Sequence, residues 1–313
     1  MNHKHTSFVL LFCMLFVLFC TGCSDPSKST DTDAAHKGPP RDNTPQVLIP
    51  TADGTVLFGN DIISIDASSA SSGFLMLQYS GSSDKAKMQL KAPNGVTYTY
   101  LISEKEELQT FPFSGGDGTY QISIFECVSV EDDLYALVFS QSIDVSLENE
   151  FLPFLYPNEY VNFTSDSAVV GKGSELAADC YSDLEVIQQV YSYVTKNIEY
   201  DTEKAQSVVY GYLPDVDDTL FSGKGICFDY AATMAAMLRS QSIPTRLEVG
   251  YSSDALHAWI STYVEEFGWI DNIIEFNGET WTLLDPTLAA SNSSESVGKY
   301  IGDGSHYLLK YSY

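Results

Sequence analysis

The stretch "GKGICFDYAATMAAMLRS", residues Gly223–Ser240, joins a glycine-rich turn to a run of small and apolar residues at helical spacing. We expect a helix that begins near Cys227. A thiol at a helix N-terminus lies among unpaired backbone N–H groups and at the positive end of the dipole, and both favour the thiolate. Gly223 and Gly225 allow a carbonyl group to approach the sulfur closely. Cys227 is therefore a candidate nucleophile, although a structural role is commoner for a cysteine on an alanine-rich helix.

A thiol nucleophile needs a base, and histidine is the usual one. Beyond the N-terminal leader the sequence has three histidines, His36, His257 and His306. His257 opens "HAWISTYV", whose alternation predicts a strand with His257 and Trp259 on one side. A histidine at the start of a buried strand can be held in one orientation, as a general base requires. The alternative is a core histidine bonded to the backbone.

Asp285 supplies a third candidate group. It precedes Pro286 at the end of "WTLLDPT", and the proline favours an extended backbone at Asp285. A carboxylate at a strand end can accept the ring N–H of a histidine on a neighbouring strand, fix its tautomer and stabilise the imidazolium. The alternative is an ordinary Asp-Pro-Thr turn.

Taken together, "GKGICFDYA", "HAWI" and "WTLLDPT" resemble the transglutaminase-like superfamily, whose core is a papain-like Cys-His-Asp arrangement. The resemblance extends over residues 180–290. It implies an α+β domain in which a helix bearing the cysteine packs on an antiparallel sheet bearing the histidine and the aspartate. By this resemblance Cys227 is the nucleophile, His257 the base and acid, and Asp285 the orienting carboxylate.

The resemblance also implies a chemistry, which is acyl transfer from a peptide or side-chain amide through a thioester on Cys227. The backbone N–H of Cys227 would stabilise the oxyanion, and Tyr200 is a candidate second donor. Asp229 is expected to support the helix start. The family includes hydrolases and cross-linking enzymes, so a peptidase or amidase and a transglutaminase both stay open. The alternative is a non-catalytic envelope protein that uses this fold to bind peptides or wall fragments.

The N-terminus has the pattern of an export signal. Lys4 precedes an apolar run from Phe8 to Cys20, followed by "TGCSD". Residues 1–23 resemble a bacterial lipoprotein signal peptide in which Cys23 is lipidated, and residues 24–46 read as a flexible stalk. We therefore expect an extracytoplasmic protein anchored to the cell membrane by a lipidated cysteine. A plain signal peptide or an uncleaved anchor is the alternative.

Charge and cysteine usage limit the partners. Lys and Arg number 16 against 42 Asp and Glu, a net charge of −26, which repels phosphate backbones and excludes nucleic acid as an expected partner. Peptides, proteins or cell-wall peptides are the expected substrates. Outside the leader, Cys127, Cys180 and Cys227 allow at most one disulfide, and a Cys180–Cys227 redox pair is one possibility. "DVDD" at 215–218 lacks the spacing of a calcium loop, so we expect a solvated acidic loop and no cofactor or metal.

Two folded regions are expected after the stalk. Residues 47–147 contain short alternating segments, among them a hairpin built from "KAKMQLK", a turn at "APNG" and "VTYTYLI", and they predict an antiparallel β-sandwich. Residues 148–313 contain a helix that Ser182 and Glu185 begin as a capping box, a polar loop at 201–225, the Cys227 helix and several strands. The second region is expected to be the transglutaminase-like domain, and the chain as a whole is α+β.

Overall fold

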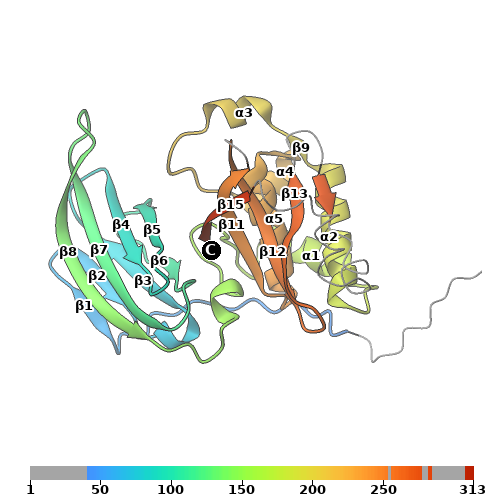
Figure 1. Cartoon of the computed structure of the whole chain (residues 1–313), viewed down its shortest axis with the longest axis horizontal. Helices are drawn as coiled ribbons and strands as arrows, with labels where there is room; N and C mark the ends of the chain where they lie inside the picture. Colours follow the sequence, from blue (N-terminus) through green and yellow to red (C-terminus); the bar gives the residue numbers. More distant parts are fainter. Residues whose placement is uncertain (1–40, 253–254, 277–280, 284–306) are drawn as a thin grey trace, which may run out of the picture. The chain divides into compact units, whose positions relative to one another are not determined.

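The computed structural model describes residues 41–252, 255–276, 281–283 and 307–313, shown in Figure 1. Cys23, His36, Asp285 and His306 lie outside these residues. What the sequence predicts for them therefore stays a prediction, as do the domain boundaries. Residues Gly38–Tyr313 form one compact unit.

The first sheet of the N-terminal region is antiparallel and has the strand order β1-β2-β3-β6. Its strands are β1 (Leu57–Gly59), β2 (Ile63–Asp66), β3 (Phe74–Tyr79) and β6 (Gln109–Pro112). The 3-10 turn η1 (Ala70–Ser72) joins β2 to β3, and Gly73 follows it with φ +93°. The burial of β3 is nearly continuous, as expected for a central strand of a packed sheet.

The second sheet has the order β5-β4-β7-β8 and contains the hairpin expected from the sequence. Its strands are β4 (Ala86–Lys91), β5 (Thr97–Ile102), β7 (Gly118–Ser129) and β8 (Leu134–Val145). Strands β4 and β5 pair from Ala86↔Ile102 to Lys91↔Thr97, and the Asn94 side chain accepts the Val96 N–H in the turn.

Both sheets contribute to one apolar core. Alternation buries one face of β4, with Met88 and Leu90, which share an apolar cluster with Ile65 and Leu77 of the other sheet. The expected β-sandwich is confirmed. Aromatic rings fill its interior, and the ring centroids of Tyr100 and Phe111 lie 4.9 Å apart.

Two helices open the second region. The 3-10 turn η2 (Leu152–Phe154) leads to α1 (Ala168–Ala177) and α2 (Asp183–Asn197). Ser182 begins α2, since its side chain accepts the Glu185 N–H at 3.3 Å. The Glu185 carboxylate accepts the Tyr181 N–H at 2.6 Å, one residue earlier than in the expected capping box.

The segment expected to be a polar loop contains short regular elements. They are α3 (Thr202–Ser207), α4 (Val216–Ser222) and β10 (Lys224–Gly225), and β9 (Glu199–Tyr200) directly precedes the segment. The prediction of a solvated acidic loop at 215–218 was wrong, because Asp215 caps α4 and Asp217 accepts the N–H groups of Ala168 and Val169, each at 3.0 Å. Carboxylates at helix N-termini satisfy otherwise unpaired donors, which explains why this acidic run is structured.

The helix that begins at Cys227 is α5 (Cys227–Ser240), and it packs against an antiparallel sheet of order β14-β13-β12-β11-β15 (Figure 1). The strands are β11 (Thr245–Ser252), β12 (Ala255–Val264), β13 (Gly268–Phe276), β14 (Trp281–Leu283) and β15 (Tyr307–Ser312). Almost all of α5 is buried, which suits its small side chains. A helix on an antiparallel sheet, preceded by a β-sandwich, confirms the α+β class.

Arg239 fixes the far end of α5. Its side chain is 1% exposed, and its guanidinium donates to the carbonyl groups of Thr245, Tyr156 and Tyr313 at 2.8 to 3.0 Å. Burial lowers the pKa of Arg239 to about 9, so the group stays charged at neutral pH. The Arg239 guanidinium thus links α5 to the segment before α1 and to the end of the chain after β15.

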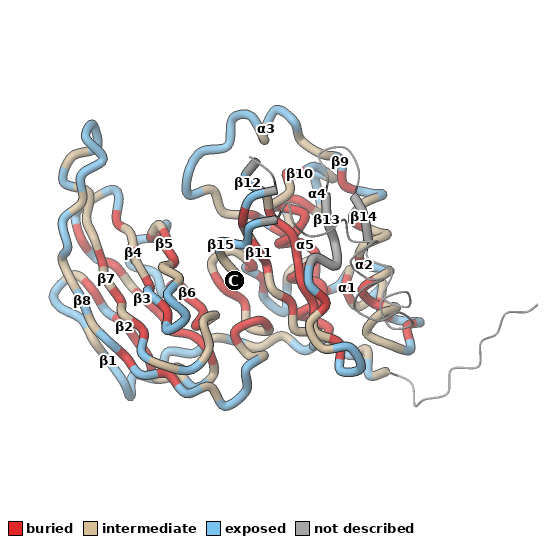
Figure 2. Tube along the Cα trace, viewed as in Figure 1, coloured by how far each residue is buried: buried red, intermediate tan, exposed pale blue. Residues whose placement is uncertain are grey.

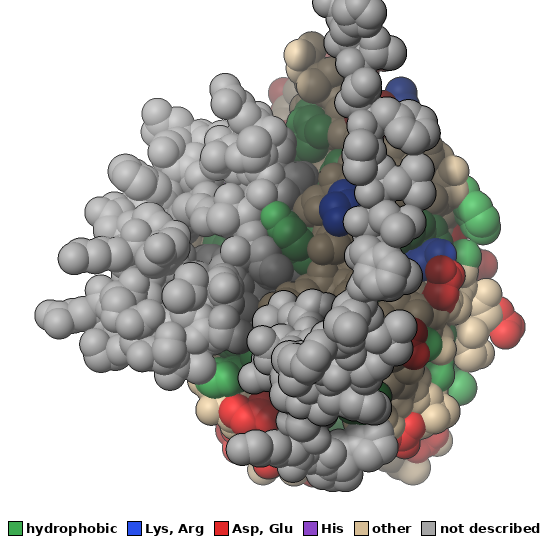
Figure 3. Space-filling model, turned by 90° about the vertical axis from the view of Figure 1, so that its right-hand side faces the viewer, with side chains coloured by type: hydrophobic (Ala, Val, Ile, Leu, Met, Phe, Trp, Pro, Cys, Tyr) green, Lys and Arg blue, Asp and Glu red, His purple; other side chains and the backbone are tan. Residues whose placement is uncertain are grey.

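In the part of the chain that the structure describes, no helix is long and apolar enough to cross a membrane. The acidic side chains visible in Figure 3 are dispersed over that face of the molecule and do not form one patch. The acidic side chains visible on this face therefore do not indicate a single site for a cation.

Candidate active site

Two glycines shape the approach to Cys227, the first residue of α5. Gly223 ends α4 in the left-handed conformation with φ +63°. At Gly225 a Cβ atom would come 2.7 Å from the Cβ of Asp229, so only glycine fits. Gly225 is buried, and its role is close packing under the helix start, whereas the sequence had suggested space for a carbonyl group.

The thiol of Cys227 is half-buried and touches the sheet. Burial raises the pKa of Cys227, and this effect outweighs the nearby backbone N–H groups of Ala258 and Phe228, which favour the thiolate as expected for a helix start. The resting sulfur is a thiol, and a nucleophilic role requires a base that accepts its proton.

His257 lies one residue from the amide that contacts this sulfur. It is the third residue of β12, it is half-buried, and its register partner on β11 is Gly250. Because Ala258 follows His257 directly, the structure brings Cys227 and the His257 backbone together, although they are 30 positions apart in the sequence. The third candidate, Asp285, lies outside the described residues.

Tyr200 also lies at the sulfur. Strand β9 pairs in parallel with β10, which sets Tyr200 opposite Gly225, two residues before Cys227. The Tyr200 hydroxyl lies beside the backbone and the side chain of Cys227. Burial, followed by the neighbouring Cys227, raises the pKa of Tyr200, so the phenol stays protonated and able to donate. The candidate second oxyanion donor is therefore next to the candidate nucleophile.

Asp229 supports the helix start, as expected, and also binds a neighbouring segment. Its side chain is completely buried and accepts the Ile226 N–H at 2.8 Å. The same carboxylate accepts from the Lys204 ammonium at 2.7 Å and from the Tyr212 hydroxyl. No sequence pattern indicated a role for Lys204 and Tyr212, because they lie in an aperiodic segment. Asp229 thus ties the segment after β9 to the turn that carries Cys227.

A second acidic side chain is buried on the opposite face of this sheet. Glu248 of β11 is 4% exposed and accepts from the Trp259 indole at 2.8 Å and from the Ser261 hydroxyl at 2.6 Å. Burial raises the pKa of Glu248. These bonds cross-link β11 and β12 and hold rigid the strand that carries His257.

The three described cysteines are free thiols: Cys127, Cys180 and Cys227. A Cys180–Cys227 redox pair is therefore not formed in this structure. Among the described side chains, no group of three His, Cys, Asp or Glu is arranged to hold a metal ion.

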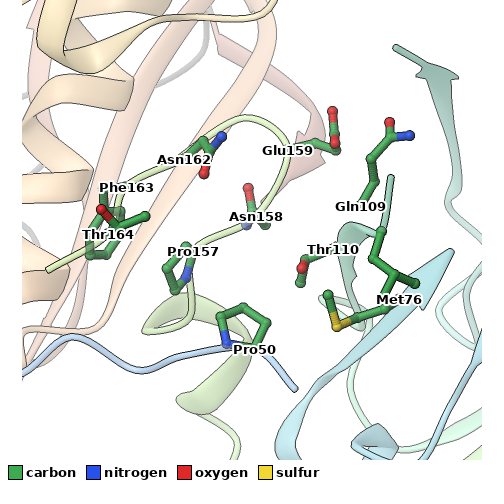
Figure 4. Close-up of a pocket in the computed structure, with 11 residues that line it drawn as sticks. Pro50, Met76, Gln109, Thr110, Pro157, Asn158, Glu159, Asn162, Phe163 and Thr164 are labelled. Atoms are coloured by element: carbon green, nitrogen blue, oxygen red, sulfur yellow. The ribbon is translucent and has the colours of Figure 1, made fainter. Parts of the chain in front are cut away.

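A cavity of about 220 Å³ lies elsewhere, between Met76 and Gln109 of the sandwich sheets and the segment 157–164 (Figure 4). Glu159 lines it, and burial raises the pKa of Glu159 to about 7. The lining includes neither Cys227 nor His257, so we give this cavity no part in the reaction.

Comparison with known proteins gives one family match, over the segment that contains α5 and β12. Residues 173–272 match the model of the transglutaminase-like superfamily, and this segment contains Cys227 and His257 and ends before Asp285. No curated protein matches the chain.

Solved structures with similar folds were found at low identity. A candidate cysteine protease from Cytophaga hutchinsonii is 13% identical, with 83% of this chain and 74% of that chain covered and a TM-score of 0.37. The periplasmic domain of TgpA from Pseudomonas aeruginosa is 15% identical, with 68% and 92% covered and a TM-score of 0.32. A structure described as a TGase is 18% identical, with 52% and 48% covered and a TM-score of 0.31.

Proposed function

Because residues 173–272 form a transglutaminase-like domain, we propose that the protein is a cysteine-dependent acyl-transfer enzyme that acts on peptide or side-chain amides. The observation that carries the proposal is the position of the Cys227 sulfur, at the first residue of α5 and against the amide that follows His257. A papain-like reaction needs a thiol beside an imidazole, and the nearness of the Ala258 backbone to the sulfur supports this role for the preceding residue, His257.

The first half-reaction forms a thioester. His257 accepts the thiol proton while the sulfur attacks the amide carbon, and the C–S bond forms as the carbonyl oxygen becomes an oxyanion. His257 then gives the proton to the amine, the C–N bond breaks and the amine leaves. Since burial keeps Cys227 protonated at rest, this transfer is the step that activates it. Asp285 is proposed to accept the other ring N–H of His257.

The oxyanion would bind the backbone N–H of Cys227 and the hydroxyl of Tyr200. In the resting site the Tyr200 hydroxyl lies beside Cys227, so the substrate oxygen would bind next to it. Loss of one oxyanion donor typically lowers kcat by about 100-fold or more. Tyr200→Phe should show such a loss if the hydroxyl is a donor, whereas a faster enzyme would show that the hydroxyl only blocks the site.

The second half-reaction decides the type of enzyme. Water or an amine attacks the thioester, His257 takes the proton of the attacking group and returns it to the sulfur, and the acyl product leaves. We favour hydrolysis, since water is always available, and retain cross-linking as the competing outcome.

The test uses a peptide library together with a tagged primary amine, incubated with the wild type and with Cys227→Ala and read by mass spectrometry. Cleaved or deamidated peptides from the wild type alone would establish a hydrolase, and tagged peptides a transglutaminase. Inertness of the wild type towards the whole library would contradict the proposal and favour a non-catalytic protein that binds peptides or wall fragments.

We further propose that the enzyme works outside the cytoplasm, tethered to the cell membrane through lipidated Cys23, on peptides, proteins or cell-wall peptides. The support is the sequence pattern at residues 1–23. Incorporation of labelled fatty acid by the wild type and its loss in Cys23→Ser would test the anchor. Release of an unlabelled wild type into the medium would contradict it.

A further inference from the structure

The segment between β9 and α4 contains an uncharged run in a strongly acidic protein. Residues Ala205–Pro214 include no charged side chain, although the chain has 42 acidic residues. Within the run, Val208, Val209 and Tyr210 are 40%, 74% and 76% exposed. Figure 2 shows this part of the chain at the surface. Large apolar side chains exposed side by side indicate a binding surface more often than single ones do.

Both ends of this run are fastened to one buried carboxylate. On the N-terminal side, the Lys204 ammonium lies 2.7 Å from Asp229 Oδ2, with 28% of the lysine side chain exposed. On the C-terminal side, the Tyr212 hydroxyl donates to the other oxygen of Asp229. The Lys204 ammonium also lies 4.5 Å from the centre of the Tyr212 ring, so the two anchors contact each other.

The anchors place the run beside the candidate nucleophile. Asp229 is the third residue of α5, and its Oδ2 also accepts the N–H of Ile226, the residue before Cys227. The Tyr212 ring is 6.5 Å from the ring of Phe228, the residue after Cys227. Only three residues separate Lys204 from Val208, and one residue separates Tyr210 from Tyr212, so the exposed side chains lie within a short length of chain from the two anchors.

A glycine turns the chain at the end of the exposed side chains. Gly211 has φ +87°, which favours glycine, and a Cβ there would come 2.1 Å from Leu101 Cδ1 of strand β5. The chain therefore reverses direction at Gly211, where it contacts the sandwich, and the side chains of Val209 and Tyr210 are exposed. We call Val208–Gly211 the apolar strap.

We propose that the apolar strap is a substrate-binding element, which takes an apolar side chain of the peptide next to the reacting amide. The inference rests on the proposed function and specifies its substrate class. An apolar partner suits the strap because the run carries no charge that could recognise an ionic group, and the acidic surface elsewhere would repel acidic peptides. Apolar contacts of this size typically change kcat/KM by about 10- to 200-fold between substrates.

The experiment uses two hexapeptides, Gly-Gly-Leu-Gln-Gly-Gly and Gly-Gly-Ser-Gln-Gly-Gly, both with blocked ends. Their binding is measured with Cys227→Ala and their turnover with the otherwise wild-type protein. Each measurement is repeated with the strap variant Val209→Ser/Tyr210→Ser. The matched control is Val128→Ser/Val130→Ser, which removes two apolar side chains of similar exposure, 65% and 66%, from the sandwich.

We expect the leucine peptide to bind at least about tenfold more tightly than the serine peptide, and the strap variant to remove this preference by raising KM at unchanged kcat. The control should keep the preference. Equal binding of the two peptides, or a preference that survives in the strap variant, would overturn the inference. Selective binding without turnover would contradict the proposed function and leave the strap as a peptide site, so the two failures are distinguishable.

Discussion

The sandwich core consists mainly of apolar and aromatic side chains, whereas the helix and sheet around Cys227 bury Asp229, Arg239 and Glu248. Apolar burial stabilises a fold without fixing one exact arrangement, and buried charges contribute little net stability while demanding exact partners. The two regions should therefore respond differently to substitution. Substitutions in the sandwich should change stability alone. Substitutions among the buried charges should change stability, and they should also change activity when they lie close to Cys227.

The largest effect is expected at the centre of the sandwich. Phe111 is fully buried and packs edge-on against Tyr100, so Phe111→Ala leaves a cavity and should lower the free energy of unfolding by about 4 kcal/mol. Urea unfolding measures this loss. Turnover by the protein that remains folded should match the wild type, and a matching fall in kcat would show that the sandwich contributes to the site.

Arg239→Met tests a buried charge far from the chemistry. The change leaves three carbonyl groups without their donor and should lower the free energy of unfolding by about 3 kcal/mol. Arg239 lies 12 residues after Cys227, about 18 Å along the helix. We therefore expect kcat/KM to change by less than about twofold. Arg246→Met, which removes an arginine stacked on Trp269, is the control, and an equal loss of stability there would contradict a special role for Arg239.

Lys204→Met tests a buried charge at the site itself. Loss of the ammonium leaves Asp229 with less compensation, and because Lys204 is partly exposed we expect a stability loss of about 2 kcal/mol. The position of the helix start also changes, so kcat/KM should fall about tenfold. The control Lys172→Met removes an ion pair to Glu175 on the surface of α1 and should do neither. Unchanged turnover in Lys204→Met would show that the ion pair between Lys204 and Asp229 has only a structural role.

The smallest effect is a pH dependence at the cavity of the sandwich. Burial raises the pKa of Glu159 from 4.5 to about 7, so its protonated form stabilises the folded state. This contribution is complete below pH 4.5 and is lost as the pH rises through 7. Since Glu159 is partly exposed, we expect Glu159→Gln to reduce the fall in stability between pH 5 and pH 8 by about 1 kcal/mol. Glu104→Gln, at an exposed neighbour, should leave that fall unchanged.

Local patterns in the sequence were sufficient for the hairpin of β4 and β5 and for the start of α2. Alternation and a Pro-Asn-Gly turn predict the first, and Ser182 ahead of an amphipathic run predicts the second. The placement of Cys227 at a helix start was also predicted, because glycines and a change of periodicity lie within a few residues of each other.

Tertiary contacts decided what the sequence could not. Lys204 and Tyr212 reach Asp229 from 25 and 17 residues away, out of a segment whose helices are too short to show a period. The acceptors of Arg239 are backbone carbonyls, which have no side-chain signature in a sequence. The raised pKa of Cys227 could not be predicted for the same reason, since the helix dipole is a local effect and desolvation depends on the whole fold.

The burial that keeps Cys227 protonated has a protective consequence. The thiolate is the form that attacks peroxides and disulfides, so we expect a neutral and half-covered sulfur to oxidise slowly. The Cys227 sulfur becomes open to oxidation only when a base removes its proton. In the proposed reaction the same proton transfer begins turnover.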